Sequence, residues 1–533
     1  MKGRKILAQP LASFALLMLA GCETYSEEPT DIATDYLIEN GLVYDGSGTA
    51  PRIADIALRA DRIVFIGDAT EGQFADATVI DATDLIVAPG FIDPHTHADN
   101  QLTSSDPQER QNKAYAFQGV TTVLVGNDGH GRTEISKMAA QVRQEPIGTN
   151  VAYLAGFGYI RKTVIGEDDR APTEAESSRM KDMMTRAMCE GAVGLSAGLY
   201  YTPQNFARTA EVIELAKISG QQGGYYDTHL RDESSYNIGL TGAVNEAIEI
   251  GAQSGAALHI SHIKALGPAV WGQSDEIISL VNAAREKGQK ITADQYPWAA
   301  SGTRISNALV PRWALDGGLS GLRARLGNVA TLNRIKGEMA DNLERRGGAD
   351  KLLITGALGD ADVEIGRTLA DHAVQQRSDP LDVAVDILKT GDARVASFNM
   401  NTDDILAFAK QEWVVTGSDG STGHPRKYAS FPKAYRDFVV DGKLMSLSRF
   451  IRRSSGQTAD IVGLKDRGYL KVGMAADIIV FDSESFTPRA TYEQSRLLST
   501  GVQHLFVNGQ PVIRDGQSTG ALPGRPLLKE TQC

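Results

Sequence analysis

The middle of this 533-residue chain repeats one unit, a short apolar strand followed by an amphipathic helix, and this repeat limits the available folds. The helical stretches place apolar residues three and four positions apart, as in TEAESSRMKDMMTRAMCEG. The expected strands lie at residues 90–97, 120–126, 151–155, 192–197, 224–229, 257–262, 290–295 and 413–418. This alternation predicts an α/β protein with a (β/α)8 barrel of the TIM type, with a doubly wound sheet as the second choice.

Two β-rich segments flank the repeat. Residues from about 35 to 87 form short alternating runs between Gly, Asn and Asp turns, and the same texture returns in GYLKVGMAADIIVFD and GVQHLFVNGQPVIRDG. We therefore expect one β-sandwich domain built from both ends of the chain, and an insertion over the barrel mouth where the rhythm breaks. The expected segments are the first half of the β-sandwich at 23–88, the barrel at 89–425 with the insertion at about 301–366, a helical segment at 426–465, and the second half of the β-sandwich with the tail at 466–533.

The N-terminal residues have the order of an export signal. A basic start, MKGRK, precedes a short apolar run at 11–20, and Leu19-Ala20-Gly21-Cys22 follows. This run is too short for a helix that crosses a bilayer, which needs about 20 apolar residues, so it predicts a secretory signal peptide at 1–21. Small residues before a cysteine resemble the lipobox of bacterial lipoproteins, and we expect an exported protein, periplasmic or on the cell surface, anchored by a lipid on Cys22. An ordinary signal peptide with an incidental cysteine is the alternative.

Charge and cysteine content exclude some function classes. The chain carries 54 Lys and Arg against 66 Asp and Glu, a formal net charge of −12, which argues against a nucleic-acid binder that neutralises phosphates. Three cysteines are too few for a disulfide scaffold or an array of zinc fingers. Cys189 and Cys533 remain beside Cys22. The sequence does not show whether they are close in space, and the default expectation is two free thiols.

Polar residues stand where the predicted strands end, which is where barrels place their active sites. His95 and His97 are two apart on an extended chain, so both side chains project to the same side and suit a metal ion. The further ligand candidates, found at later strand ends, are Asp128, His229, His262 and Asp419. This nitrogen and oxygen set predicts one or two divalent ions, Zn²⁺ first, with Mn²⁺ or Co²⁺ as substitutes.

The remaining polar groups near these strand ends indicate a metal-dependent hydrolase. A divalent metal lowers the pKa of a bound water to about 7, and Asp419 would carry the proton from that water to the leaving amine. Lys264 and Arg426 supply positive charge beside the centre, and Tyr296 ends the seventh strand. Cations at this place in an acidic chain predict a small amide substrate that carries a carboxylate.

Other candidate residues fit structural roles better. Gly194-Leu195-Ser196-Ala197-Gly198 matches the Gly-x-Ser-x-Gly nucleophile elbow, but LYYTPQNF follows where the elbow needs a helix, so Ser196 is not expected to be a nucleophile. His259 is odd in register with His262 and is expected to face the surrounding helices. His130 is expected to be a solvated loop residue, with substrate contact as the alternative.

These residues resemble the amidohydrolase superfamily and, within it, the N-acyl-D-amino-acid deacylases (D-aminoacylases). The shared signatures cover nearly all of the chain after the leader and include PGFIDPHTHAD, GVTTVLVGNDG, THLRDE, HISHIK, ADQYPW, TGSDGSTGHPRKYASFPK and GYLKVGMAADIIVFD. The resemblance implies a barrel with a β-sandwich and a zinc hydrolase that acts on an amide C–N bond. It assigns the first metal site to His95 and His97, the tightly held zinc to His229 and His262, the acid/base role to Asp419, and the substrate's α-carboxylate to Lys264, Tyr296 and Arg426.

The chain departs from this pattern at two positions. Many amidohydrolases bridge two metals with a carboxylated Lys on the fourth strand, whereas AVGLSAGL has none. D-aminoacylases use a Cys in Gly-Asn-Cys-Gly after the second strand, and this chain reads Gly-Asn-Asp-Gly. The bridging role therefore falls to Asp128.

The leading hypothesis is an N-acyl-amino-acid amidohydrolase that acts on D-configured substrates. The enzymatic alternatives are a D-aminoacyl dipeptidase and a cyclic-amide hydrolase of the dihydroorotase or hydantoinase type, against which the missing Lys on the fourth strand counts. A lipid-anchored binding protein with a degenerate metal site is the non-enzymatic alternative. The intact ligand set with Asp419 counts against it, because a binding protein has no need of a proton shuttle.

Overall fold

The computed structural model describes residue 1, residues 33–530 and residue 533. The predicted lipid-bearing Cys22, with nearly all of the expected signal peptide, falls in residues 2–32, outside the described residues. Among the described residues, no helix is long and apolar enough to cross a membrane.

Eight parallel strands form the predicted barrel, and each pairs with its neighbour in chain order. They are β6 (Phe91–Asp93), β7 (Val120–Val125), β8 (Asn150–Gly156), β9 (Gly194–Gly198), β10 (Tyr225–His229), β11 (Ala257–Ile260), β12 (Ile291–Gln295) and β16 (Val414–Thr416). The first and last strands meet just beyond their carboxyl ends, through a parallel bridge between Thr96 and Gly420. The backbone N–H of Asp419 also donates to the carbonyl of His95 at 3.0 Å. The barrel therefore closes at the point where two candidate metal ligands stand.

Helices cover the outside of the barrel. The principal ones are α4 (Ile135–Gln144), α5 (Phe157–Val164), α6 (Glu174–Cys189), α7 (Thr209–Gln221), α8 (Gly239–Ser254), α9 (Ser274–Glu286) and α15 (Thr402–Ala409). Short helices α1 (Asp99–Leu102), α2 (Pro107–Arg110) and α3 (Lys113–Ala116) follow β6, and α16 (Arg426–Tyr435), a π-helical turn (Arg436–Asp441), α17 (Leu447–Ser454) and α18 (Gly456–Val462) follow the last barrel strand.

Local sequence explains why these helices begin and end where they do. Helix α6 begins after Thr173, whose hydroxyl accepts from the N–H of Glu176 while the Glu176 carboxylate accepts from the N–H of Thr173. This reciprocal capping satisfies two N–H groups that a helix start leaves without partners. Helix α8 ends at Gly255, whose φ of 72° lies in the left-handed region that favours glycine.

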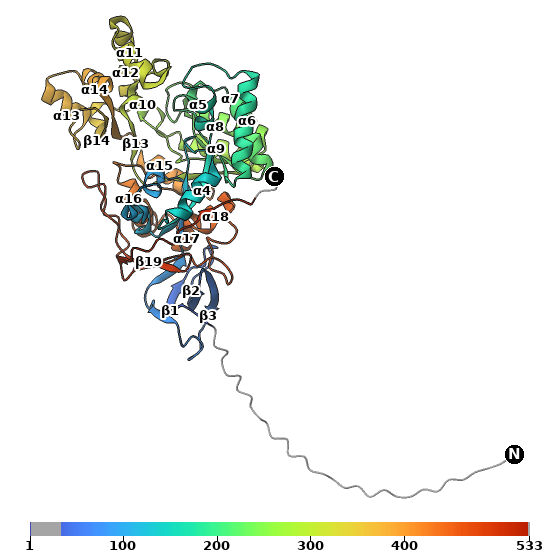
Figure 1. Cartoon of the computed structure of the whole chain (residues 1–533). Helices are drawn as coiled ribbons and strands as arrows, with labels where there is room; N and C mark the ends of the chain where they lie inside the picture. The colour runs from blue at the N-terminus through green and yellow to red at the C-terminus, as the bar shows by residue number, and fades with distance from the viewer. Residues whose placement is uncertain (2–32, 531–532) are drawn as a thin grey trace.

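A separate unit is inserted between β12 and β16 (Figure 1, upper left). Its antiparallel sheet places β15 (Gly391–Phe398) between β13 (Ala300–Arg304) and β14 (Leu352–Gly359). Its helices are α10 (Ile305–Leu309), α11 (Gly318–Leu326), α12 (Val329–Arg345), α13 (Leu369–Gln376) and α14 (Pro380–Thr390). These elements share a hydrophobic core distinct from that of the barrel. The unit continues past residue 366, where the sequence rhythm places its end, because its central strand comes last in the chain.

Strands from both ends of the chain form a β domain at the lower end of Figure 1, as predicted. They are β1 (Tyr36–Val43), β2 (Arg52–Arg59), β3 (Arg62–Gly67), β4 (Thr78–Asp81), β5 (Ile86–Pro89), β17 (Ile478–Phe481), β18 (Val502–Val507), β19 (Gln510–Arg514) and β20 (Gln517–Ser518). The two halves join where β5 pairs antiparallel with β17. Side chains from both halves, including Ile38, Ile56, Ile478 and Phe506, share one core. This shared core joins the strands before the barrel and the strands after it in one domain.

The expectation of two free thiols is wrong, because Cys189 and Cys533 form a disulfide with their Cα atoms 5.7 Å apart. The tail leaves the β domain and runs back along the barrel, where β21 (Pro526–Leu527) pairs with β8. The N–H of Lys529 then donates to the carbonyl of Gly191, just after α6. Figure 1 shows the C terminus beside α6. Only this path of the tail brings two cysteines 344 residues apart into contact.

Candidate metal centre

The candidate ligands from five strand ends meet at the barrel mouth. His95 and His97 follow β6, Asp128 follows β7, His229 ends β10, His262 follows β11 and Asp419 follows β16. Their ligand atoms form two groups, each within 4.8 Å, and the groups are His95, His97, Asp128 and Asp419, and Asp128, His229 and His262. The structure therefore brings all six predicted ligand candidates together, with Asp128 common to both groups.

The Asp128 carboxylate lies between four histidines. Its Oδ1 is 3.5 Å from both His95 Nε2 and His262 Nε2 and 3.8 Å from His229 Nδ1. Its Oδ2 is 3.5 Å from His97 Nε2. Two ligand atoms on one tetrahedral Zn²⁺, each about 2.0–2.1 Å from the ion, are about 3.3 Å apart. These separations suit a carboxylate that bridges two ions.

Unsatisfied polar atoms support the same interpretation. His95 Nε2 and Asp128 Oδ1 are buried and have no hydrogen-bond partner among the described residues. A buried polar atom without a partner is costly, so such atoms mark a place that an ion can fill. The imidazole and carboxylate donors are those that Zn²⁺ and related ions prefer. The residues present therefore fit a divalent metal.

The electrostatic field at His95 and His262 favours a positive charge. Burial opposes protonation of His95, but the charges of Asp128, Asp294 and Asp419 outweigh it and raise the pKa of His95 to about 10. Burial and Lys264 likewise oppose protonation of His262, yet the nearby carboxylates raise its pKa to about 9. The field that holds a proton on these imidazoles also attracts a metal cation.

An unusual backbone conformation orients three of these side chains toward the centre. Asp128, His262 and Asp419 have φ values of 56°, 36° and 46°, in a region that residues other than glycine rarely adopt. Strain of this kind persists only where the surroundings enforce it, and it concentrates at functional sites. At Asp128 the enforcing contact comes from Gln204, whose side-chain amide donates to the Asp128 carbonyl at 2.8 Å.

Ser196 has a structural role in the same loop. Its hydroxyl donates to the carbonyl of Gly126 at 2.5 Å and accepts from the N–H of Gly129 at 3.1 Å. The side chain is fully buried and clamps the turn that carries Asp128. This placement agrees with the prediction that Ser196 is not a nucleophile.

Asp419 joins the centre to a buried arginine. Its Oδ1 is 3.2 Å from His97 Nε2, and its Oδ2 is 2.8 Å from Arg426 Nη1. Burial would raise the pKa of Asp419, but Arg426 and the neighbouring histidines hold it well below its usual range. Asp419 is therefore a carboxylate at neutral pH, the form that can accept a proton.

Glu233, which the sequence reasoning missed, organises the other side of the centre. Its Oε1 is 3.1 Å from His262 Nδ1 and 2.6 Å from Lys264 Nζ, and its Oε2 is 3.7 Å from His229 Nε2. A carboxylate on the outer nitrogen of a ligating histidine fixes the orientation of the ring. Glu233 could have been predicted from the sequence THLRDE, because it stands only four residues after the candidate ligand His229. Lys264 is thus already ion-paired.

His259 faces the barrel interior, so the expectation that it faces the helices is wrong. Its Nε2 is 3.1 Å from Asp294 Oδ2, and its Nδ1 is 2.8 Å from Thr292 Oγ1. Asp294 Oδ2 in turn is 3.8 Å from His95 Nδ1. His262 follows the end of β11 at Ile260 in a left-handed conformation, so the alternation of the strand does not extend to it and both histidines point inward.

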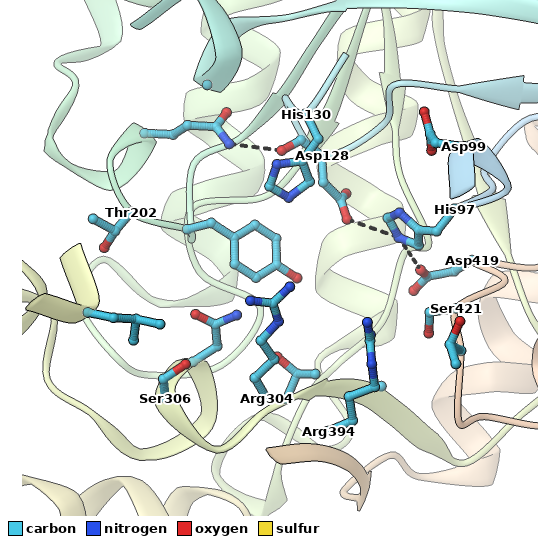
Figure 2. Close-up of a pocket in the computed structure, with 18 of the residues that line it drawn as sticks. His97, Asp99, Asp128, His130, Thr202, Arg304, Ser306, Arg394, Asp419 and Ser421 are labelled. Atoms are coloured by element: carbon cyan, nitrogen blue, oxygen red, sulfur yellow. Dashed lines mark hydrogen bonds and ion pairs between the residues drawn. The ribbon is translucent and has the colours of Figure 1, made fainter. Parts of the chain in front are cut away.

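A cavity of about 730 Å³ opens onto the centre and is lined by His97, Asp128 and Asp419 (Figure 2). His130 is exposed and lines this cavity as well. A smaller adjoining pocket of about 20 Å³ is lined by the three predicted substrate-binding residues, Lys264, Tyr296 and Arg426. Arg426 and Asp419 line both spaces, so a molecule in the large cavity can reach the small pocket and the metal centre together.

Comparison with known proteins agrees with this geometry. The chain is 30% identical over 522 residues to a D-aminoacylase of Alcaligenes xylosoxydans xylosoxydans, covering 93% of this chain and 98% of that protein. It is also 30% identical over 523 residues to an N-acyl-D-glutamate deacylase of the same organism, covering 93% and 97%. The crystal structure of N-acyl-D-glutamate deacylase from Bordetella bronchiseptica, in complex with zinc and a phosphonate mimic of the tetrahedral intermediate, superposes with a TM-score of 0.79. That match has 29% identity and covers 93% of this chain and 100% of the other.

The family model described as "Amidohydrolase family" matches residues 78–246 and 358–513, more than half of the chain. Five of the six candidate metal ligands lie within the matched residues, and His262 lies between the two matched segments. The barrel, the shared carboxylate and the matched residues lead to one conclusion. The chain belongs to the amidohydrolase family.

Proposed function

We propose that this protein is a metal-dependent hydrolase that cleaves the amide bond of N-acyl-D-amino acids. The observation that carries the proposal is the Asp128 carboxylate between four histidines, with Asp419 beside them at 3.2 Å from His97. The D configuration is supported by the D-aminoacylase and N-acyl-D-glutamate deacylase relatives.

The residues around the centre have distinct roles in this reaction. A bound divalent ion supplies a water of lowered pKa, about 7, and polarises the amide carbonyl. Asp419, kept ionised by Arg426, accepts the proton of the attacking water and delivers it to the departing amine. Glu233 keeps His262 oriented toward the centre through its 3.1 Å contact.

The α-carboxylate of the substrate binds in the small pocket lined by Lys264, Tyr296 and Arg426. This assignment is supported by the position of the pocket, since Asp419 lines it as well. Both cations already have a carboxylate partner, Glu233 for Lys264 and Asp419 for Arg426. The incoming carboxylate therefore adds to two existing ion pairs. The planar guanidinium of Arg426 has enough N–H donors to bind the Asp419 carboxylate and the substrate carboxylate together.

The test is an assay of the purified chain with N-acetyl-D- and N-acetyl-L-amino acids. The protein is first stripped with a chelator and then reloaded with Zn²⁺, Mn²⁺ or Co²⁺. We expect turnover of the D series that disappears on stripping and returns on reloading. Turnover of D-dipeptides or of dihydroorotate and hydantoins in place of N-acyl substrates would favour the alternatives, and no turnover of any amide would leave a binding protein.

We also propose that the chain is exported and anchored through a lipid on Cys22. The proposal is supported by the order of basic, apolar and small residues before Cys22, and by the Cys189–Cys533 disulfide, because such bonds persist in oxidising compartments. Expression of the full chain with labelled palmitate in a bacterial host tests it. Label should enter the wild type and not Cys22→Ala, and equal label in both would refute it.

A further inference from the structure

Two arginines of the inserted unit stand opposite each other at the cavity. Arg304 ends β13, and its register partner across the antiparallel pair is Arg394 of β15. Both side chains line the 730 Å³ cavity that opens onto the metal centre. Figure 2 shows them side by side, pointing into the cavity, with His97, Asp128 and Asp419 on the far side.

Arg304 is exposed and Arg394 is half-buried, and neither guanidinium has a partner in the part of the chain that the structure describes. Within the described residues, no carboxylate oxygen lies within 4 Å of a guanidinium nitrogen of either arginine, and neither guanidinium donates a hydrogen bond. The nearby carboxylate of Asp392 is already engaged by the hydroxyl and N–H of Ser306 and the N–H of Ala393. Burial, together with the charge of Arg304, lowers the pKa of Arg394. Like charges directly opposite across a strand pair are destabilising. The carboxylate of Asp392 acts in the opposite direction, yet the pKa of Arg394 stays lowered, so the protein compensates this pair only in part.

The other cations at the cavity differ from this pair. Arg132 contacts Glu134 at 3.9 Å, and Lys162 contacts Glu167 at 2.5 Å. Arg426 contacts Asp419 at 2.8 Å. Unmatched positive charge at the cavity is therefore concentrated on β13 and β15.

The sheet makes room for this pair. Arg394 is flanked on its other side by Gly356 of β14, at a register shift between Ile354 and Gly356. A Cβ added at Gly356 would lie 3.3 Å from Arg394 Cδ, so glycine leaves space for the arginine stem. The hydroxyl-bearing residues Thr303 and Ser421 line the same region of the cavity. Cations and hydroxyl groups together suit an oxyanion.

We propose that Arg304 and Arg394 form a subsite for a second anionic group of the substrate, so that the preferred substrates are N-acyl-amino acids with two carboxylates. The proposal rests on the proposed function, which assigns the α-carboxylate to the pocket of Lys264, Tyr296 and Arg426. The second carboxylate belongs either to the amino-acid side chain or to the acyl group. Two guanidinium groups at the end of the cavity can bind it from either source.

The experiment compares matched acidic and neutral substrates on the metal-loaded enzyme. The side-chain arm uses N-acetyl-D-glutamate against N-acetyl-D-glutamine, and the acyl arm uses N-succinyl-D-alanine against its succinamide counterpart. We expect at least a tenfold higher kcat/KM for the acidic member in one arm, and that arm identifies the source of the charge. Arg394→Gln and Arg304→Gln should each reduce this preference about tenfold, mainly through KM, with little change for the neutral substrate.

Arg132→Gln is the matched control, because Arg132 lines the same cavity but is paired with Glu134. It should leave the preference unchanged. Retained activity on the neutral substrate shows that each variant is folded. Equal rates for acidic and neutral substrates in both arms, or an equal loss in Arg132→Gln, would overturn the subsite while the deacylase proposal stands. Failure to hydrolyse any N-acyl substrate would overturn the proposed function and this inference with it.

Discussion

Replacing Asp128 should remove both metal ions with one substitution. Asp128 contributes to both ligand groups, whereas His97 belongs to only one of them. Structural Zn²⁺ sites bind with about 10–16 kcal/mol of apparent free energy, so one of four ligands contributes about 2.5–4 kcal/mol. Since 1.4 kcal/mol is a factor of ten, Asp128→Ala should raise the dissociation constant of each ion by about 10²–10³.

The assay is equilibrium dialysis against buffered free Zn²⁺, followed by metal analysis per chain. Asp128→Ala should lose metal at both positions and nearly all activity. His97→Ala is the matched control and should lose metal only at the position it shares with His95. Circular dichroism of the chelated proteins checks that all variants are folded.

Two further measurements test the bridging role of a carboxylate. A carboxylate has two hard oxygen donors and shares its charge between two ions more evenly than a thiolate, so the wild type should bind two ions with similar affinity and accept Mn²⁺ or Co²⁺. Asp128→Cys should restore one tightly bound Zn²⁺. If Asp128→Ala keeps its full metal content and normal turnover, Asp128 is not the bridge and the description of the centre is wrong.

Three more substitutions and one pH-dependent measurement test the site and the disulfide. Asp419→Asn keeps the shape of the side chain but cannot take a proton, so kcat should fall by about 10²–10⁴, and a variant that retains most of its kcat would move the proton role elsewhere. Arg426→Ala should raise KM about tenfold or more for free N-acyl-amino acids, since a hydrogen bond to a charged group contributes about 1.5–3 kcal/mol. The KM for the corresponding amides should rise much less, because they lack the charge. An equal rise for acids and amides would show that Arg426 does not bind the α-carboxylate. His95 and His262 have pKa values of about 10 and 9, so at pH 7.5 both are protonated without metal. Metal loading should then release about two protons, fewer as the pH rises through 9 to 10, and calorimetry in buffers of different ionisation enthalpy measures this number. Cys189→Ser should lower the free energy of unfolding by about 2–5 kcal/mol, seen as a lower denaturant midpoint that matches that of the reduced wild type, and an unchanged midpoint would refute it.

Local patterns were sufficient to predict the barrel and most of its centre. Several barrel strands are short apolar runs, such as VTTVLV in β7, and these runs recur between amphipathic helices, so their positions can be predicted from residue type. Parallel strands in a barrel put their carboxyl ends at one rim, so polar residues at successive strand ends must converge there. This is why His95, His97, Asp128 and Asp419 could be predicted together from their positions in the sequence.

The tertiary structure decided what depends on contacts between distant segments or on a single backbone angle. The left-handed conformation at His262, beyond the end of β11, puts its side chain on the same inner side as that of His259, because strand alternation holds only while φ stays extended. The path of the C-terminal tail joined Cys189 to Cys533 across 344 residues. Arg304 and Arg394 face the metal centre only because β13 pairs with β15, a strand about 90 residues later in the chain. Sequence spacing carries no information on such encounters, since they are set by how separately folded segments pack against each other.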